Sequence, residues 1–223
     1  MAYRTEDARK QFEHWGVNYD KDWLQKLFFG PTHQMLLEEI RPDEKVVLDI
    51  GCGSGRFATR LLESAPERRI IGLDLSEAML RGARWRSDES DGRIHVVQGD
   101  SEHLPFPDNY FDLVTCNHSF HHFPNQKRVI EEMYRVLRPG GRLMISEGDR
   151  DRFWGWLIFD VIVVLIEGPV KHLPSWEFRA LFEKTGFADV FHLRRGGLLP
   201  FSITIGTAIK PAATSAHPVR RSA

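Results

Sequence analysis

Residues 46–55 read Val-Val-Leu-Asp-Ile-Gly-Cys-Gly-Ser-Gly, an apolar run with one carboxylate, followed by glycine at every second position. Such a run is typical of a parallel-sheet strand that is covered on both faces. The glycines after it let the backbone pass close to a ligand, because no Cβ stands in the way. Residues 56–63 then have helical spacing. The stretch predicts a strand, a glycine turn and a helix, the place where an α/β sheet binds a nucleotide-like ligand.

Strands and helices alternate from this stretch onward. The predicted strands are Val46–Ile50, Ile70–Leu73, Ile94–Gln98, Phe111–Cys116 and Arg142–Ser146. The predicted helices are Arg56–Ser64, Ser76–Trp85 and Asn125–Leu137. This alternation indicates βαβ units and a parallel sheet with helices on both faces. The predicted fold class is α/β, a Rossmann-like three-layer sandwich.

The N-terminal part departs from this alternation. Residues 1–42 are predicted to form a helical cap that begins at Thr5, is interrupted at residues 16–20 and is broken again at Gly30-Pro31.

The last third also changes character. Residues 148–174 are expected to form a lid insertion, and their apolar run 153–166 falls short of the roughly 18 residues that suggest a membrane span. A helix is predicted over Ser175–Lys184, and two β-rich runs, Phe187–Leu193 and Phe201–Ile209, predict a C-terminal antiparallel hairpin. We therefore expect a single domain over residues 1–210 and a disordered tail over residues 211–223.

Composition narrows the class of protein. The 223 residues are 42% hydrophobic, with a formal net charge of −1, so no overall basic field favours a nucleic-acid partner. The two cysteines, Cys52 and Cys116, have neither disulfide nor metal-site spacing, and the N-terminus lacks the apolar region of a secretory signal. We expect a cytoplasmic protein.

The turn does not match the common phosphate-binding motifs. The dinucleotide fingerprint requires a third glycine where this chain has Arg56, and the Gly-Lys-Ser/Thr of a P-loop is absent. We therefore do not expect the protein to bind its ligand mainly through phosphate groups. Asp74 follows the second strand, where a carboxylate can accept from both hydroxyls of a ribose. Asp100 follows the third strand and could accept from an adenine amino group, and Asp49 could bind a cationic amino group.

Four motifs in order resemble the class I S-adenosylmethionine-dependent methyltransferases, most closely the branch with the ubiquinone/menaquinone methyltransferases. The motifs are residues 47–55, Asp74, residues 99–112 and residues 135–147. The resemblance is strong over about residues 40–150 and weak at both ends. It implies a seven-stranded sheet whose last strand is antiparallel, S-adenosylmethionine as cofactor, and a small-molecule acceptor.

The resemblance also implies roles for individual residues. Asp49, Gly51 and Gly53 would hold the methionine part, and Asp74 with Leu75 would bind the ribose side. Asp100 and Ser101 would meet the adenine. Asn117 and His118 would close over the cofactor near its sulfonium, and Tyr19 with the N-terminal helices would cover the site.

Several alternatives stay open. His118 or His121 could act as a general base, or this loop could supply only backbone contacts and packing. His118 and His122 are four residues apart, but no acid lies near them in the chain and Cys116 lacks the spacing of a metal ligand, so no metal is expected. The run 153–166 could be a packed lid, a surface for peripheral membrane or lipid contact, or a homodimer interface. The protein could accordingly be a monomer or a homodimer.

Two classes of function fit these sequence features. The first is methyl transfer from S-adenosylmethionine to a small hydrophobic or aromatic acceptor, through O, N, C or S. The second is a non-catalytic S-adenosylmethionine-binding module or assembly partner. A nicotinamide-dependent oxidoreductase is disfavoured by Arg56.

Overall fold

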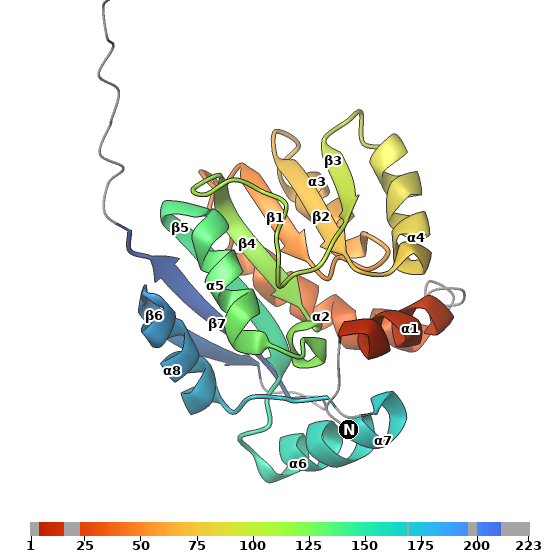
Figure 1. The fold of residues 1–223 in the computed structure, drawn as a ribbon, viewed down its shortest axis with the longest axis vertical. Helices are drawn as coiled ribbons and strands as arrows, with labels where there is room; N and C mark the ends of the chain where they lie inside the picture. The colour runs from red at the N-terminus through yellow and green to blue at the C-terminus, as the bar shows by residue number, and fades with distance from the viewer. Residues whose placement is uncertain (1–4, 16–22, 169, 196–199, 211–223) are drawn as a thin grey trace, which may run out of the picture.

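A seven-stranded sheet runs through the middle of the molecule, with helices on both of its faces (Figure 1). The structure is a computed structural model that describes residues 5–15, 23–168, 170–195 and 200–210. The strand order is β3-β2-β1-β4-β5-β7-β6, and β7 runs antiparallel to both of its neighbours. The strands are β1 (Val46–Ile50), β2 (Arg69–Asp74), β3 (Ile94–Gln98), β4 (Phe111–Asn117), β5 (Leu137–Gly148), β6 (Phe187–Arg195) and β7 (Phe201–Ala208). The predicted sheet, with its antiparallel C-terminal pair, is confirmed.

The helices form two layers over this sheet. They are α1 (Thr5–Trp15), α2 (Trp23–Glu39), α3 (Arg56–Ser64), α4 (Glu77–Asp88), α5 (Gln126–Val136), α6 (Phe153–Trp156), α7 (Val163–Glu167) and α8 (Ser175–Thr185). One core cluster joins α2 and α3 to the sheet through residues such as Leu36 and Leu61. The other joins α5 and α8 through Val129, Met133 and Phe178. These helices therefore bury their apolar stripes against the sheet.

Capping residues determine where two of the helices begin. The hydroxyl of Ser76 accepts from the Met79 N–H (3.3 Å) at the start of α4, and Asn125 accepts from the Arg128 N–H (3.2 Å) at the start of α5. Both side chains satisfy an N–H that has no partner within the helix. The two predicted helices start at these capping residues, one position before the observed helices.

The predicted break at Gly30-Pro31 is wrong. Helix α2 continues through Pro31, although the missing N–H removes one backbone hydrogen bond. Contacts beyond the local sequence hold the helix together: Arg60 donates to the Gly30 carbonyl (3.2 Å) and to Gln34 Oε1 (3.1 Å). Leu36, one turn later, is fully buried. Tertiary contacts therefore outweigh the local breaker.

Strand β5 also begins earlier than the predicted start at Arg142. It starts at Leu137, which pairs with Phe111 of β4, and the register shifts between Phe111 and Leu113. Pro139-Gly140-Gly141 lies within this bulged stretch. Proline and glycine are tolerated at a bulge because the hydrogen-bond ladder is already interrupted there.

The apolar run after β5 is helical. It forms α6, the π-helical turn η3 (Leu157–Ile162) and α7, at the bottom of Figure 1. Phe159 is buried, whereas Phe153, Trp154 and Leu165 are 67%, 68% and 81% exposed. Among the described helices, none is long and apolar enough to cross a membrane. The tail predicted over residues 211–223 lies outside the described residues.

Candidate functional site

The turn after β1 forms the base of the candidate site. Gly51, Gly53 and Gly55 all have positive φ (68°, 54° and 81°), a conformation that glycine adopts at little cost. The Gly51 N–H donates to the Leu73 carbonyl (2.8 Å), which ties the turn to the end of β2. A Cβ on Gly51 would lie 2.3 Å from Ser119 Oγ. The backbone can follow this path only because residue 51 has no side chain.

Asp74 receives two backbone hydrogen bonds at the end of β2. Its Oδ2 accepts from the Gly53 N–H (2.8 Å), and its Oδ1 accepts from the Ser76 N–H (2.9 Å). These bonds fix the carboxylate beside the glycine turn. A carboxylate offers about four acceptor positions, so about two remain for a ligand.

Asp49 lies at the end of β1, opposite Thr115 of β4 in the sheet register. The Thr115 hydroxyl donates to Asp49 Oδ1 (2.8 Å). Burial raises the pKa of Asp49 to about 7, against this hydrogen bond and with a smaller contribution from Asp74. A buried carboxylate with so little compensation is well suited to bind a cation.

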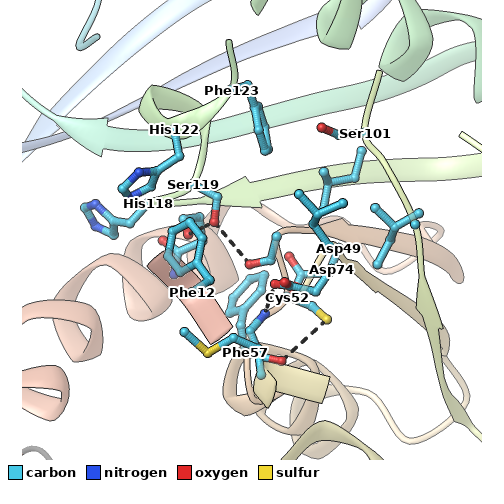
Figure 2. Close-up of a pocket in the computed structure, with 18 of the residues that line it drawn as sticks. Phe12, Asp49, Cys52, Phe57, Asp74, Ser101, His118, Ser119, His122 and Phe123 are labelled. Carbon is cyan, nitrogen blue, oxygen red and sulfur yellow. Dashed lines mark hydrogen bonds between the residues drawn. The ribbon is translucent and has the colours of Figure 1, made fainter. Parts of the chain in front are cut away.

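A pocket of about 1030 Å³ opens over these strand ends, and Figure 2 shows part of its lining. Its lining includes most of the predicted cofactor residues: Asp49, Gly51, Gly53, Asp74, Leu75, Asp100, Ser101, Asn117 and His118. The predicted Tyr19 lies outside the described residues, so its placement stays a prediction.

Apolar side chains add to the lining of this pocket. Phe12 of α1 packs edge-on against His122, with ring centroids 4.7 Å apart, and Phe29 of α2 lies 5.1 Å from the His118 ring. Phe123 and Pro124 line the pocket as well. The pocket thus combines charged strand ends with an apolar aromatic wall.

Helix α1 is attached to the rest of the site through Glu13. Its carboxylate accepts from the N–H groups of Glu77 (2.7 Å) and Ala78 (3.2 Å) at the start of α4, and from the Ser76 hydroxyl (3.3 Å). A carboxylate is stabilised at a helix N-terminus by the free N–H groups and the helix dipole. Glu13 therefore holds α1, and with it Phe12, next to the pocket.

The histidines predicted as candidate bases occupy different places. His118 lines the pocket, has a positive φ of 50°, and has no hydrogen-bond partner for Nε2 among the described residues. Burial lowers its pKa to about 4, which keeps the ring neutral at neutral pH. His121 is not part of the described pocket lining. Its Nδ1 lies 2.6 Å from Glu147 Oε2.

The residues of this region that the sequence did not predict include the aromatic residues Phe12 and Phe29 of the wall and the polar residues Glu13, Thr115, Glu147 and His172. Glu147 directly follows a predicted parallel strand. It could have been predicted as a site residue, because the carboxyl ends of parallel strands meet at one edge of the sheet. Thr115 is recognised only from the strand register. Glu13 and His172 carry no local signal, since their partners lie far away in the chain.

Comparisons with a family model and with curated proteins all match methyltransferases. The family model described as a methyltransferase domain matches residues 48–145. A demethylmenaquinone methyltransferase of Listeria welshimeri is 38% identical over 160 residues, covering 69% of this chain and 67% of the relative. A ubiquinone/menaquinone biosynthesis C-methyltransferase of Methylobacterium nodulans is 32% identical over 207 residues, covering 79% and 82%.

Two solved structures share the fold. One is a putative methyltransferase of Haloferax volcanii in complex with the Trm112 methyltransferase activator, with a TM-score of 0.78 and 22% identity, over 92% of this chain and 98% of that one. The other is a possible histamine N-methyltransferase of Thermotoga maritima, with a TM-score of 0.74 and 24% identity, over 90% and 99%.

Proposed function

The chain belongs to the class I S-adenosylmethionine-dependent methyltransferases, and we propose that its methyl acceptor is a small, apolar aromatic compound of the quinol type. It is an enzyme that uses S-adenosylmethionine as methyl donor. The cofactor supplies a methyl group on a positively charged sulfur. The protein must therefore bind the cofactor, align an acceptor behind the methyl group and keep water away.

The observation that supports the proposed cofactor positions is the set of carboxylates at the strand ends. We place the ribose hydroxyls on the two free acceptor positions of Asp74. The methionine ammonium is placed beside Asp49, where a cation would relieve the burial of the carboxylate. Gly51 and Gly53 let the backbone approach the methionine part, and any side chain on Gly51 would collide with Ser119.

The adenine is placed on the β3 side of the pocket. Asp100 and Ser101 line that side, and Asp100 Oδ1 already accepts from the Glu102 N–H (2.9 Å), which orients the carboxylate. Leu75 and Phe123 also line the pocket. A flat apolar base gains both stacking contact and an acceptor for its amino group in this position.

The acceptor is placed against the aromatic wall of Phe12, Phe29 and His118. This wall offers apolar contact and few charges, which suits an aromatic ring better than a sugar or a nucleic acid. The relatives named above are methyltransferases of demethylmenaquinone and of ubiquinone/menaquinone biosynthesis, which favours a quinol among the aromatic acceptors.

His118 is the proposed proton acceptor. A quinol hydroxyl must lose its proton so that the neighbouring ring carbon can attack the methyl group. Bound S-adenosylmethionine would supply the methyl group and leave as S-adenosylhomocysteine, so that a carbon–methyl bond would replace the methyl–sulfur bond. The ring hydrogen would then leave as a proton to water, and the proton held by His118 would return to the ring oxygen, which restores the aromatic quinol and the neutral histidine. His118 can take the first proton because its ring lines the pocket and its Nε2 has no hydrogen-bond partner among the described residues.

The decisive experiment is an activity assay with a reduced short-chain demethylnaphthoquinol, with a catechol and a primary amine as competitors. We expect a carbon-methylated quinol as the main product, identified by mass spectrometry. His118→Asn should lower kcat by about 10²- to 10⁴-fold, the usual contribution of a general base. Asparagine tolerates the positive φ at this position, so the backbone is preserved.

Asp74→Ala should weaken the binding of S-adenosylhomocysteine in calorimetry, whereas Asp43→Ala at an exposed turn should not. Methylation of the amine alone would contradict the proposed acceptor while leaving the cofactor site intact. Equal cofactor affinity in the Asp74 and Asp43 variants would contradict the proposed cofactor site.

A further inference from the structure

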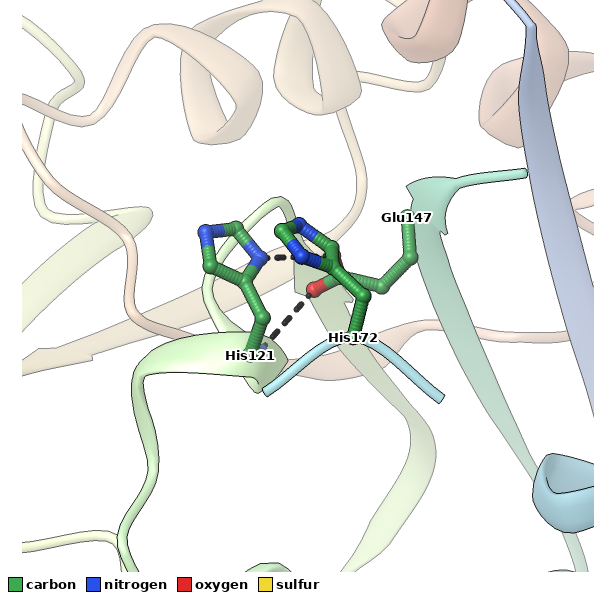
Figure 3. Close-up of side chains that lie close together, drawn as sticks. All are labelled: His121, Glu147 and His172. Carbon is green, nitrogen blue, oxygen red and sulfur yellow. Dashed lines mark hydrogen bonds and ion pairs between the residues drawn. The ribbon is translucent and has the colours of Figure 1, made fainter. Parts of the chain in front are cut away.

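Three buried side chains from separate segments of the chain lie close together (Figure 3). His121 comes from the short 3-10 helix η2 (Phe120–His122), Glu147 from the end of β5, and His172 from the segment between α7 and α8. One donor atom of each lies within 4.8 Å of the other two. Residues separated by up to 51 positions in the sequence thus form one compact polar group inside the protein.

The surrounding structure fixes these side chains. Glu147 Oε1 accepts from the N–H groups of Phe120 (2.9 Å) and His121 (3.3 Å), so the carboxylate cannot rotate freely. The carbonyl of His172 accepts from Arg150 Nη1 (2.8 Å). The rings of His121 and His172 stack with centroids 4.3 Å apart. The cluster is therefore preorganised, as a binding site requires.

The hydrogen bonds within the cluster are incomplete. His121 Nδ1 is 2.6 Å from Glu147 Oε2, but His172 Nε2 is 4.0 Å from the same oxygen, beyond hydrogen-bonding distance. His172 is only 3% exposed, and its Nδ1 has no hydrogen-bond partner among the described residues. Neither nitrogen of this buried ring is hydrogen-bonded among the described residues, so Nε2, which lies 4.0 Å from Glu147, is available to bind a ligand.

We propose that His121, Glu147 and His172 bind a divalent transition-metal ion such as Zn²⁺. Two imidazoles and one carboxylate are a common donor set for Zn²⁺ and related ions, with an open position for a further ligand. Ligands in a tetrahedral zinc site lie about 3.3 Å apart, since each metal–ligand bond is about 2.0–2.1 Å. The observed separations of 2.6 Å and 4.0 Å fall on either side of this value, so only small side-chain shifts are needed.

A second group of potential ligands shows the contrast. Asp149, Asp151 and His192 are also close together, but Arg194 forms ion pairs with both carboxylates. In that group a guanidinium already occupies both carboxylates and offsets part of their charge, which disfavours a metal there. No cation of this kind contacts Glu147 among the described residues; its ion-pair partners there are the two histidines.

The metal would connect three elements at one wall of the active site. It would join η2 and β5 to the segment that enters α8, directly beside His122, which lines the pocket. The sequence predicts no metal because no acid stands near the histidines in the chain; the fold supplies Glu147. This inference does not depend on the identity of the methyl acceptor.

The experiment uses full-length protein without a histidine tag, expressed in medium supplemented with Zn²⁺. After gel filtration, elemental analysis should find about one zinc per chain. Replacement by Co²⁺ should give the visible absorption bands of cobalt bound to nitrogen and oxygen ligands. His172→Ala and Glu147→Gln should each lower the retained metal at least tenfold and remove the cobalt spectrum.

The controls are His103→Ala, at a histidine whose side chain is 74% exposed, and His192→Ala in the second group. Both should retain the metal. Far-UV circular dichroism checks the folding of each variant. His172→Ala is the decisive variant, because its side chain makes no hydrogen bond that the described fold depends on. A wild-type protein without zinc or cobalt bands, or a folded His172→Ala variant with full metal content, would overturn the proposal.

Discussion

Gly51 lies in the turn after β1, at a position where a side chain would have little room. Its backbone has a φ of 68°, and a Cβ added there would lie only 2.3 Å from Ser119 Oγ. Gly92 has a similar φ of 71°, but nothing lies within 4 Å of a Cβ there. Substitution of Gly92 would therefore cost only the strain of a positive φ, whereas substitution of Gly51 would add a steric clash with Ser119.

Gly51→Ala should therefore cost more than Gly92→Ala. We expect Gly92→Ala to lower the unfolding free energy by about 1 kcal/mol, the cost of a positive φ in a residue with a Cβ. Gly51→Ala should add about 1–3 kcal/mol for the overpacking and weaken S-adenosylhomocysteine binding at least tenfold. Chemical denaturation and calorimetry measure both effects. Equal losses in the two variants would show that the contact with Ser119 is unimportant.

Asp49 should couple cofactor binding to pH. Its pKa of about 7 means that the apo site is largely protonated at pH 6 and largely charged at pH 7.5. A cationic ammonium favours the charged form, so binding should release a proton below pH 7. The apparent Kd for S-adenosylhomocysteine should fall about five- to tenfold from pH 6 to pH 7.5, in proportion to the charged fraction.

Calorimetry in buffers with different heats of ionisation detects the released proton directly. Asp49→Asn provides the control, because its side chain does not titrate, and its Kd should be flat over this range. A pH-independent Kd in the wild-type protein would contradict the assignment of the ammonium to Asp49.

At the scale of elements, the carboxylate of Glu13 attaches α1 to the start of α4. Glu13 binds the N-terminus of α4, and Phe12 beside it forms part of the pocket wall. The sequence did not predict this contact, because 64 positions separate Glu13 from Glu77.

Glu13→Ala should loosen α1. We expect the Kd for S-adenosylhomocysteine to rise about 3- to 30-fold, which corresponds to the ~0.5–2 kcal/mol of a lost helix cap. Hydrogen exchange over residues 5–15 should become faster. Glu6→Ala, at an exposed position of the same helix, is the matched control and should change neither. If both variants behave alike, Glu13 does not anchor the helix.

At the scale of the whole molecule, buried histidines make the fold sensitive to acid. Burial lowers the pKa of His33, between Phe29 and Phe57, to about 3, and that of His118 to about 4. In the unfolded chain both titrate near 6.5. The unfolded state therefore binds more protons below pH 6.5, and these groups lower the stability as the pH falls toward 4. Asp49, whose folded pKa is raised, acts in the opposite direction between about pH 7 and 4.

His33→Phe should make the stability less dependent on pH. Each histidine that is protonated only on unfolding contributes up to ~1.4 kcal/mol per pH unit, so the slope between pH 6 and pH 4 should decrease by about that amount. Urea denaturation at a series of pH values measures the slope. The exposed His95→Phe substitution is the control and should leave it unchanged. An unchanged slope in His33→Phe would mean that His33 is protonated in the folded state.

Local sequence patterns were sufficient to predict the sheet and most of the residues that line the pocket at the strand ends. The apolar strand, the glycine turn and the acids Asp49 and Asp74 are local patterns, since each strand carries its proposed ligand-binding residue at its carboxyl end. Parallel strands bring those ends together at one edge, so their meeting follows from the fold class alone.

Contacts between segments that are distant in the chain could be recognised only from the tertiary structure. Helix α2 runs through Pro31 because Arg60 and the core support it. Glu13 reaches α4, and His172 faces Glu147, through packing of segments that have no common motif. Local propensity and spacing describe one segment at a time, whereas these contacts depend on how the helices are placed against the sheet, and that placement is decided by the packing of the whole core.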